Sequence, residues 1–201
     1  MKIKTILFDL SDVLVKGLEG SEVQIANKLN KPVGEVSDAL FTYDFNEFWL
    51  GNISEDNFLS KLINDLDWDL TINEMKLLIR ENFIEIPETR NLIKHLKKSF
   101  HLILISVNPP EWAKEFEDKF NLIELFDQIH YSYQIKYTKR EPEAFKFLIE
   151  KYKLDPSEVI LIDDSTRNLN TAKTIGILGI KFINVKQTIE ELKNFDIIIK
   201  N

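Results

Sequence analysis

Carboxylate, hydroxyl and lysine side chains stand in this sequence where they could carry out phosphoryl chemistry. Three polar positions directly follow short apolar runs: Asp9, Ser106 and the pair Asp163 and Asp164. Carboxylates that converge repel one another unless a cation lies between them, and hard oxygen donors without thiols or histidine clusters favour Mg²⁺. A carboxylate beside a metal can attack phosphorus, while a hydroxyl and a lysine hold the oxygens of the transferred group.

The apolar runs before these residues have the length and composition of buried strands. They cover residues 3–8, 102–105 and 159–162, and shorter strands are predicted at 129–132, 180–183 and 197–199. Helices are predicted between them, at 88–99, 110–120, 141–152 and 165–175, with a last helix capped at Thr188. Strands that alternate with helices predict a parallel sheet covered on both faces, and ligands bind at the carboxyl ends of such strands.

Residues 16–87 have a different, wholly helical pattern. Pro32 suits a first helical turn, and Thr71 with Glu74 resembles a capping box. We therefore predict an α/β fold: a Rossmann-like parallel sheet core of residues 1–15 and 88–201, with an α-helical cap inserted at 16–87. Most aromatic residues of the insert are expected in its core, with Phe45 or Trp49 as candidates to face a substrate.

Composition excludes several classes of protein. The 201 residues carry a net charge of −7, which disfavours non-specific nucleic-acid binding but leaves a small phosphate ester possible. The absence of cysteine rules out disulfides and zinc–thiolate sites, and the three histidines are scattered. No apolar stretch is long enough to span a membrane or act as a signal peptide. We expect a cytoplasmic monomer or homodimer whose partner is a small phosphorylated substrate.

Four short motifs occur in a fixed order outside the insert, at residues 8–14 (FDLSDVL), 104–108 (LISVN), 132–145 and 160–176. The third contains Lys139, Pro142 and Phe145, and the fourth contains Asp163 and Asp164. Each motif alone is weak, but the ordered set resembles the haloacid dehalogenase (HAD) superfamily. The sugar-phosphatase-like branch, which has a helical cap between its first and second motifs, is the most similar.

The resemblance implies a role for each matching residue. Asp9 would be the nucleophile and a metal ligand, and Lys139 would neutralise the nucleophile and the phosphate. The substrate's phosphoryl group would be bound at Ser106, Val107 and Asn108. Magnesium would be held by Asp9, the backbone carbonyl of Ser11, Asp163 and Asp164, with one of the last two acting directly and the other through water.

One departure from the family pattern affects the expected rate. Phosphatases of the family place an aspartate two residues after the nucleophile, where it protonates the leaving group and activates water. Ser11 stands there in this chain, and a serine has no useful acidity near neutral pH. Asp12 follows, but neighbouring side chains in an extended turn diverge. Arg140 and Lys136 are milder departures in the third motif.

Other interpretations of the same residues stay open. Asp9, Ser106 and the Asp163–Asp164 pair could be turn or helix-cap residues, and Lys139 could belong to a solvated face. The leading function is a phosphatase of small phosphorylated metabolites. A second is a catalytically weak HAD-like protein that binds a phosphorylated ligand or a partner, which Ser11 favours. A third is carbon–halogen hydrolysis, which needs Asp9 but gives no reason to gather Asp163 and Asp164.

Overall fold

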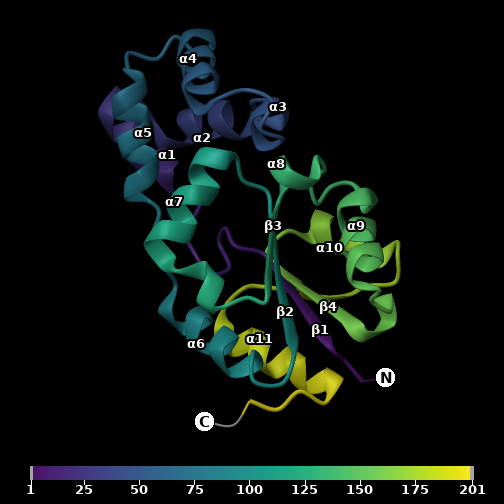
Figure 1. Cartoon of the computed structure of the whole chain (residues 1–201). Coiled ribbons are helices and arrows are strands. Elements are labelled where there is room, and N and C mark those ends of the chain that lie inside the picture. The colour runs from purple at the N-terminus through teal and green to yellow at the C-terminus, as the bar shows by residue number, and fades with distance from the viewer. Residues whose placement is uncertain (1, 200–201) are drawn as a thin grey trace.

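A five-stranded parallel sheet forms the centre of the computed structural model, which describes residues 2–199 (Figure 1). The strands lie in the order β3-β2-β1-β4-β5, and all four neighbouring pairs are parallel. Their bounds are β1 Thr5–Phe8, β2 His101–Ser106, β3 Gln128–Tyr131, β4 Val159–Asp163 and β5 Leu178–Lys181. The α/β, Rossmann-like fold predicted from the apolar runs is confirmed.

Alternate residues of the strands supply two separate apolar cores. In β1, Ile6 and Phe8 face the larger core, whereas Leu7 faces the smaller one. The larger core is covered by α6 (Pro87–Leu96), α7 (Pro110–Phe120) and α11 (Val185–Leu192), and the smaller one by α9 (Pro142–Tyr152) and α10 (Thr166–Lys173). Because helices cover both faces, the central strands β1, β2 and β4 are mostly apolar on both sides.

The stretch between β1 and α6 is helical in the structure. It contains α1 Ser21–Leu29, α2 Val33–Thr42, α3 Asn46–Trp49, α4 Glu55–Asp65 and α5 Ile72–Glu81, and it stands apart from the sheet in Figure 1. None of residues 20–80 lies in a strand. Thr71 and Glu74 form the predicted capping box at the start of α5. No helix within residues 2–199 combines the length and apolar character that crossing a membrane requires.

The C-terminal segment differs from the sequence prediction in two ways. Residues 197–199 form no strand: the sheet ends at β5, and this segment does not pair with β5. Ile197 is buried, whereas Ile198 is exposed. The last helix begins earlier than predicted and is capped by Asn184, whose side chain accepts from the Gln187 amide. Thr188 lies inside that helix and donates its hydroxyl to the Asn184 carbonyl, an arrangement common for threonine within helices.

Candidate active site

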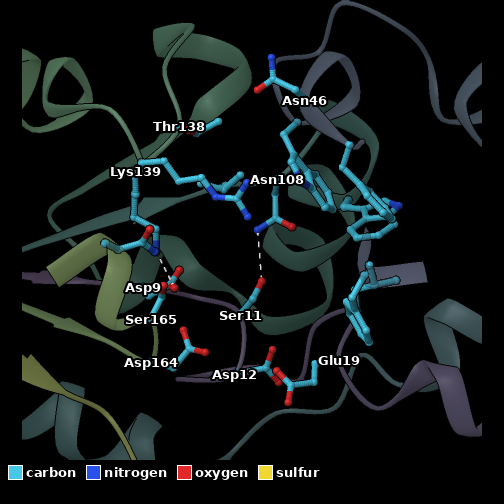
Figure 2. Close-up of a pocket in the computed structure, with 18 of the residues that line it drawn as sticks. Asp9, Ser11, Asp12, Glu19, Asn46, Asn108, Thr138, Lys139, Asp164 and Ser165 are labelled. Atoms are coloured by element: carbon cyan, nitrogen blue, oxygen red, sulfur yellow. Dashed lines mark hydrogen bonds and ion pairs between the residues drawn. The ribbon is translucent and has the colours of Figure 1, made fainter. Parts of the chain in front are cut away.

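The carboxyl ends of β4, β1 and β2 lie side by side because these strands are neighbours in the sheet. Asp9 directly follows β1, Ser106 is the last residue of β2, and Asp163 is the last residue of β4. Polar side chains from three distant parts of the chain therefore gather at one edge. A cavity of about 550 Å³ opens there, and Figure 2 shows Asp9 and Asp164 on its wall.

Lys139 is the cation at the centre of this edge. Its Nζ lies 2.5 Å from Asp9 Oδ2 and 2.7 Å from Asp163 Oδ2. The Lys139 side chain is only 2% exposed, so this ammonium is held almost entirely by the two carboxylates. Their charges raise its pKa against the opposing effect of burial, which keeps Lys139 protonated.

Asp163 and Asp164 are adjacent but have different surroundings. Asp163 is fully buried, and both its oxygens accept hydrogen bonds, from Lys139, the Ser165 amide and Asn168. Asp164 is partly exposed and lines the cavity. The carboxylate that is available to a ligand in the cavity is therefore that of Asp164, whereas Asp163 holds Lys139 in place.

The three aspartates form a compact acidic cluster. Asp9, Asp163 and Asp164 each present an oxygen within 4.8 Å of the others. Burial raises the pKa of Asp9 well above its usual range, Lys139 opposes the rise, and the charges of Asp163 and Asp164 add to it. Burial and the charge of Asp163 likewise raise the pKa of Asp164. A single lysine does not balance these groups, so a further cation would favour their charged forms.

Ser106, Val107 and Asn108 have unequal access to the cavity. Val107 and Asn108 line it, whereas Ser106 is buried and lies outside the lining. The Asn108 side-chain amide donates to Ser106 Oγ at 2.7 Å and lies 3.5 Å from Ser11 Oγ, the contact drawn in Figure 2. Ser106 therefore orients Asn108, and the amide of Asn108 is the group of the pair that faces the cavity.

The turn after Asp9 brings Ser11 and Asp12 to the same cavity. The Leu10 carbonyl accepts from the Leu14 amide at 2.9 Å, and Asp12 takes a left-handed conformation with φ of 60°. Burial raises the pKa of Asp12 to about 6, against the effect of Lys16. Gly17 passes so close that a side chain there would meet Ser11 Cβ at 2.9 Å, so the turn needs glycine at this position.

The helical insert supplies the other side of the cavity. Besides Leu18 and Glu19, it contributes a run of residues from the end of α2 through α3: Phe41, Thr42, Tyr43, Asp44, Phe45, Asn46 and Trp49. Of these, the sequence indicated only Phe45 and Trp49. It also missed Glu19 and Arg140, which line the cavity. Arg140 carried a usable signal, since an arginine follows the candidate lysine where the family favours proline.

Contacts between the insert and the core fix the position of this run. Ser132, at the start of α8 (Ser132–Ile135), donates to the Trp49 carbonyl at 2.5 Å, and Lys136 donates to the Leu50 carbonyl at 2.8 Å. Gly51 has φ of 65°, and a side chain there would meet Tyr133 Cβ at 2.8 Å. Glycine thus lets the loop after α3 lie directly on the core.

A buried ion pair lies behind the cavity. Glu55 of α4 is 3% exposed and forms a bidentate pair with Arg80 of α5. Its Oε1 also accepts from Trp112 Nε1 of α7 at 2.6 Å, and Arg80 donates to Glu115 at 2.9 Å. Because Trp112 lines the cavity, this network joins the insert to the core and fixes one ring of the cavity wall. No sequence pattern indicated this network.

Comparisons with known proteins match the chain to one family. The model of a family described as haloacid dehalogenase-like hydrolase matches residues 3–176. D-ribitol-5-phosphate phosphatase of Bacteroides thetaiotaomicron is 32% identical over 185 residues, which cover 87% of this chain and 89% of that protein.

Two solved structures show the same fold. A protein described as a HAD-like family hydrolase, from Porphyromonas gingivalis, has a TM-score of 0.79 and 22% identity, and the match covers 96% of this chain and 98% of that one. A HAD family enzyme of B. thetaiotaomicron, in complex with magnesium and inorganic phosphate, has a TM-score of 0.73 and 20% identity, with 89% and 93% covered.

Proposed function

The chain belongs to the haloacid dehalogenase-like hydrolases, and on that basis we propose that it is a Mg²⁺-dependent phosphatase of a small phosphorylated metabolite. The observation that carries the proposal is the buried Asp9–Lys139 pair, with Asp164 beside it, at the end of a cavity. A carboxylate held by a lysine at the base of a cavity is suited to attack a phosphate ester. The similarity to D-ribitol-5-phosphate phosphatase supports this class of reaction.

The residues present fit Mg²⁺. The donors are hard oxygens with an excess of negative charge, the set that Mg²⁺ prefers. Asp9, Asp164 and the backbone carbonyl of Ser11 would hold the ion, while Asp163, whose oxygens are already hydrogen-bonded, would act by holding Lys139. When bound, the ion supplies charge neutralisation for the carboxylates and for the oxygens of the transferred phosphoryl group.

The residues of the chain then divide the reaction between them. A carboxylate oxygen of Asp9 forms a bond to phosphorus while the ester P–O bond breaks, and the leaving oxygen takes a proton from solvent water to give the alcohol. Water next attacks phosphorus and gives up a proton to solvent, the bond to Asp9 breaks, and inorganic phosphate is released. Lys139 holds the negative charge of the carboxylate and of the transferred group, and the Asn108 amide is placed to donate to a phosphoryl oxygen.

We also propose that residues 16–87 act as a cap over a core of residues 1–15 and 88–201. The two connections between these parts run side by side: the Lys16 amide donates to the Ile84 carbonyl at 2.8 Å, and the Ile86 amide to the Leu14 carbonyl at 2.8 Å. The insert therefore leaves the core and returns to it at one place. Since the insert lines the cavity opposite Asp9, it would choose the substrate and exclude water.

Hydrolysis of p-nitrophenyl phosphate tests the proposal. Wild-type protein should turn over this ester with Mg²⁺ and stop when EDTA is in excess, and Asp9→Asn should lower kcat by at least about 10³-fold because it removes the nucleophile. Activity that survives both EDTA and Asp9→Asn would refute the proposal. Binding of phosphate without turnover would favour instead the catalytically weak protein that Ser11 also allows.

A further inference from the structure

We infer, on the basis of the proposed phosphatase function, that the leaving group of the substrate carries a ring that packs on an aromatic wall of the cavity. The aromatic wall consists of Phe41, Tyr43, Phe45 and Trp49, all from the insert and all lining the cavity that holds Asp9. The phosphate end of the substrate is fixed by Asp9 and Lys139. The remainder of the substrate must then extend toward the insert, because the insert forms the opposite side of the cavity.

Three rings of the wall are in contact with one another, and the fourth, Phe41, lines the same cavity. Phe45 and Trp49 are stacked, with centroids 5.0 Å apart and planes at 15°, and Tyr43 meets Phe45 edge-on at 6.2 Å. Phe41 is 46% exposed although it lines a cavity. A large apolar ring left open beside other rings gains free energy when a ligand ring covers it.

Three polar side chains of the same segment already have partners within the insert, and a fourth, that of Asn46, also lines the cavity. The Thr42 hydroxyl donates to the Asp38 carbonyl at 2.7 Å, and the Tyr43 hydroxyl donates to Asp65 at 2.6 Å. Asp44 accepts from the Asn46 amide at 2.9 Å. A leaving group rich in hydroxyls would lie mostly against ring faces there and would replace few of its hydrogen bonds to water, which is costly.

Charge also restricts the leaving group. Asp12, Glu19 and Asp44 line the cavity beyond the cluster at Asp9, so a second anionic group on the substrate would meet carboxylates. Lys139 is held by two aspartates, and Arg140, which follows it in sequence, lines the cavity as well. Three carboxylates against one arginine in this part of the lining disfavour a second anionic group, so the end of the substrate away from the phosphate suits a neutral ring.

Trp49 of the wall is held in place by the core, so it can select between substrates. Ser132 donates a hydrogen bond to the Trp49 carbonyl, and the ring centroids of Trp49 and Trp112 lie 5.4 Å apart. The indole N–H of Trp112 in turn donates to Glu55. Rings that are already in place lose little conformational entropy when a ligand binds. The inferred substrate is thus a monophosphate ester of a neutral alcohol that bears a planar or largely apolar ring.

Three esters of primary alcohols test this inference: 2-phenylethyl phosphate, n-hexyl phosphate and D-ribitol 5-phosphate. Wild-type kcat/KM with Mg²⁺ should be at least roughly tenfold higher for 2-phenylethyl phosphate than for either open-chain ester. Trp49→Leu and Phe41→Ala should each raise KM for 2-phenylethyl phosphate several-fold and change KM for D-ribitol 5-phosphate little. Leu77→Ala is the matched control, since Leu77 is 60% exposed on the insert and lies outside the cavity lining.

A preference for D-ribitol 5-phosphate, or an equal loss on all three esters in Trp49→Leu and Phe41→Ala, would overturn the inference. Calorimetry with 3-phenylpropylphosphonate and Mg²⁺ measures the contribution of the aromatic wall to binding, because this phosphonate has no ester bond to hydrolyse. Several-fold weaker binding to Phe41→Ala than to Leu77→Ala is expected, and equal binding would also overturn it. Wall-dependent binding of the phosphonate with no hydrolysis of any ester would refute the phosphatase proposal and leave the aromatic wall supported.

Discussion

The ammonium of Lys139 lies 2.5 Å from the carboxylate of Asp9, and both side chains are buried. Replacing Lys139 with methionine should lower kcat on p-nitrophenyl phosphate by about 10²–10³-fold, because a preorganised charge is lost from the developing transition state. The same change leaves Asp9 and Asp163 without their cation. The variant should therefore gain more thermal stability from added Mg²⁺ than wild type does, as followed by Tm.

Lys146→Met is the control for this change, since Lys146 is an exposed surface lysine that pairs with Glu143. It should alter neither kcat nor the effect of Mg²⁺ on Tm. A Lys139→Met protein with nearly wild-type turnover would show that the lysine is structural.

Ser11 should limit the rate on esters with poor leaving groups. Aryl phosphates leave with little protonation, whereas alkyl phosphates need an acid that serine does not supply. Ser11→Asp should therefore raise kcat on glycerol phosphate by up to about 10²-fold and change kcat on p-nitrophenyl phosphate much less. Measurement of both rates under conditions where chemistry is limiting checks this.

Equal effects of Ser11→Asp on both esters would mean that another group already supplies the proton. Asp12, which lines the cavity and has its pKa raised to about 6 by burial, is the residue to test next by Asp12→Asn. Loss of activity on alkyl esters alone in that variant would identify it.

The pair of Arg80 and Glu55 should contribute strongly to stability. Arg80→Met leaves the buried Glu55 carboxylate without its main partner and should cost about 3–5 kcal/mol of unfolding free energy, measured with denaturant. Glu115→Gln is the matched control, since Glu115 is a more exposed partner of the same arginine, and it should cost no more than about 1 kcal/mol. Similar losses in the two variants would contradict this account of the network.

His130 should make stability depend on pH. Burial, with a smaller effect of Lys151, lowers its pKa from 6.5 to about 4, and the ring nitrogen lies 2.7 Å from the Tyr152 hydroxyl. Between these two values the unfolded chain binds the proton and the folded chain does not, so stability is present above pH 6.5 and falls as pH is lowered toward 4. Relative to His130→Gln, wild type should lose about 2 kcal/mol between pH 7.5 and pH 5. Parallel losses in both proteins would contradict the assignment.

Local sequence patterns were sufficient to predict most elements of the core. The helix at 110–120 begins at a proline suited to its first turn and has the predicted bounds, and the three long apolar runs became β1, β2 and β4. The strand predicted at 197–199 was wrong because an apolar segment forms a strand only where a neighbouring strand pairs with it. The prediction that Thr188 caps the last helix was wrong because the same sequence pattern also fits a threonine inside a helix.

The candidate site was predictable in part. Motif order predicted the residues that come together in the site: Asp9, Lys139, Asp163 and Asp164. The aspartates lie at the ends of strands β1 and β4, and Lys139 lies between helices α8 and α9. The division of labour between Asp163 and Asp164 depends on burial and on hydrogen bonds from Ser165 and Asn168, which sequence alone does not reveal. The pairing of Glu55 with Arg80 and Trp112 joins segments whose contact only the tertiary fold determines.

The most direct test of the central claim is to find the phosphoryl group on the protein. Wild-type protein turning over p-nitrophenyl phosphate with Mg²⁺ is quenched in acid and digested, and the peptide that carries a phosphoryl group is identified by mass spectrometry. The account predicts the group on Asp9, with Asp9→Asn neither labelled nor active. A phosphoryl group on a different residue, or hydrolysis by Asp9→Asn at the wild-type rate, would contradict it.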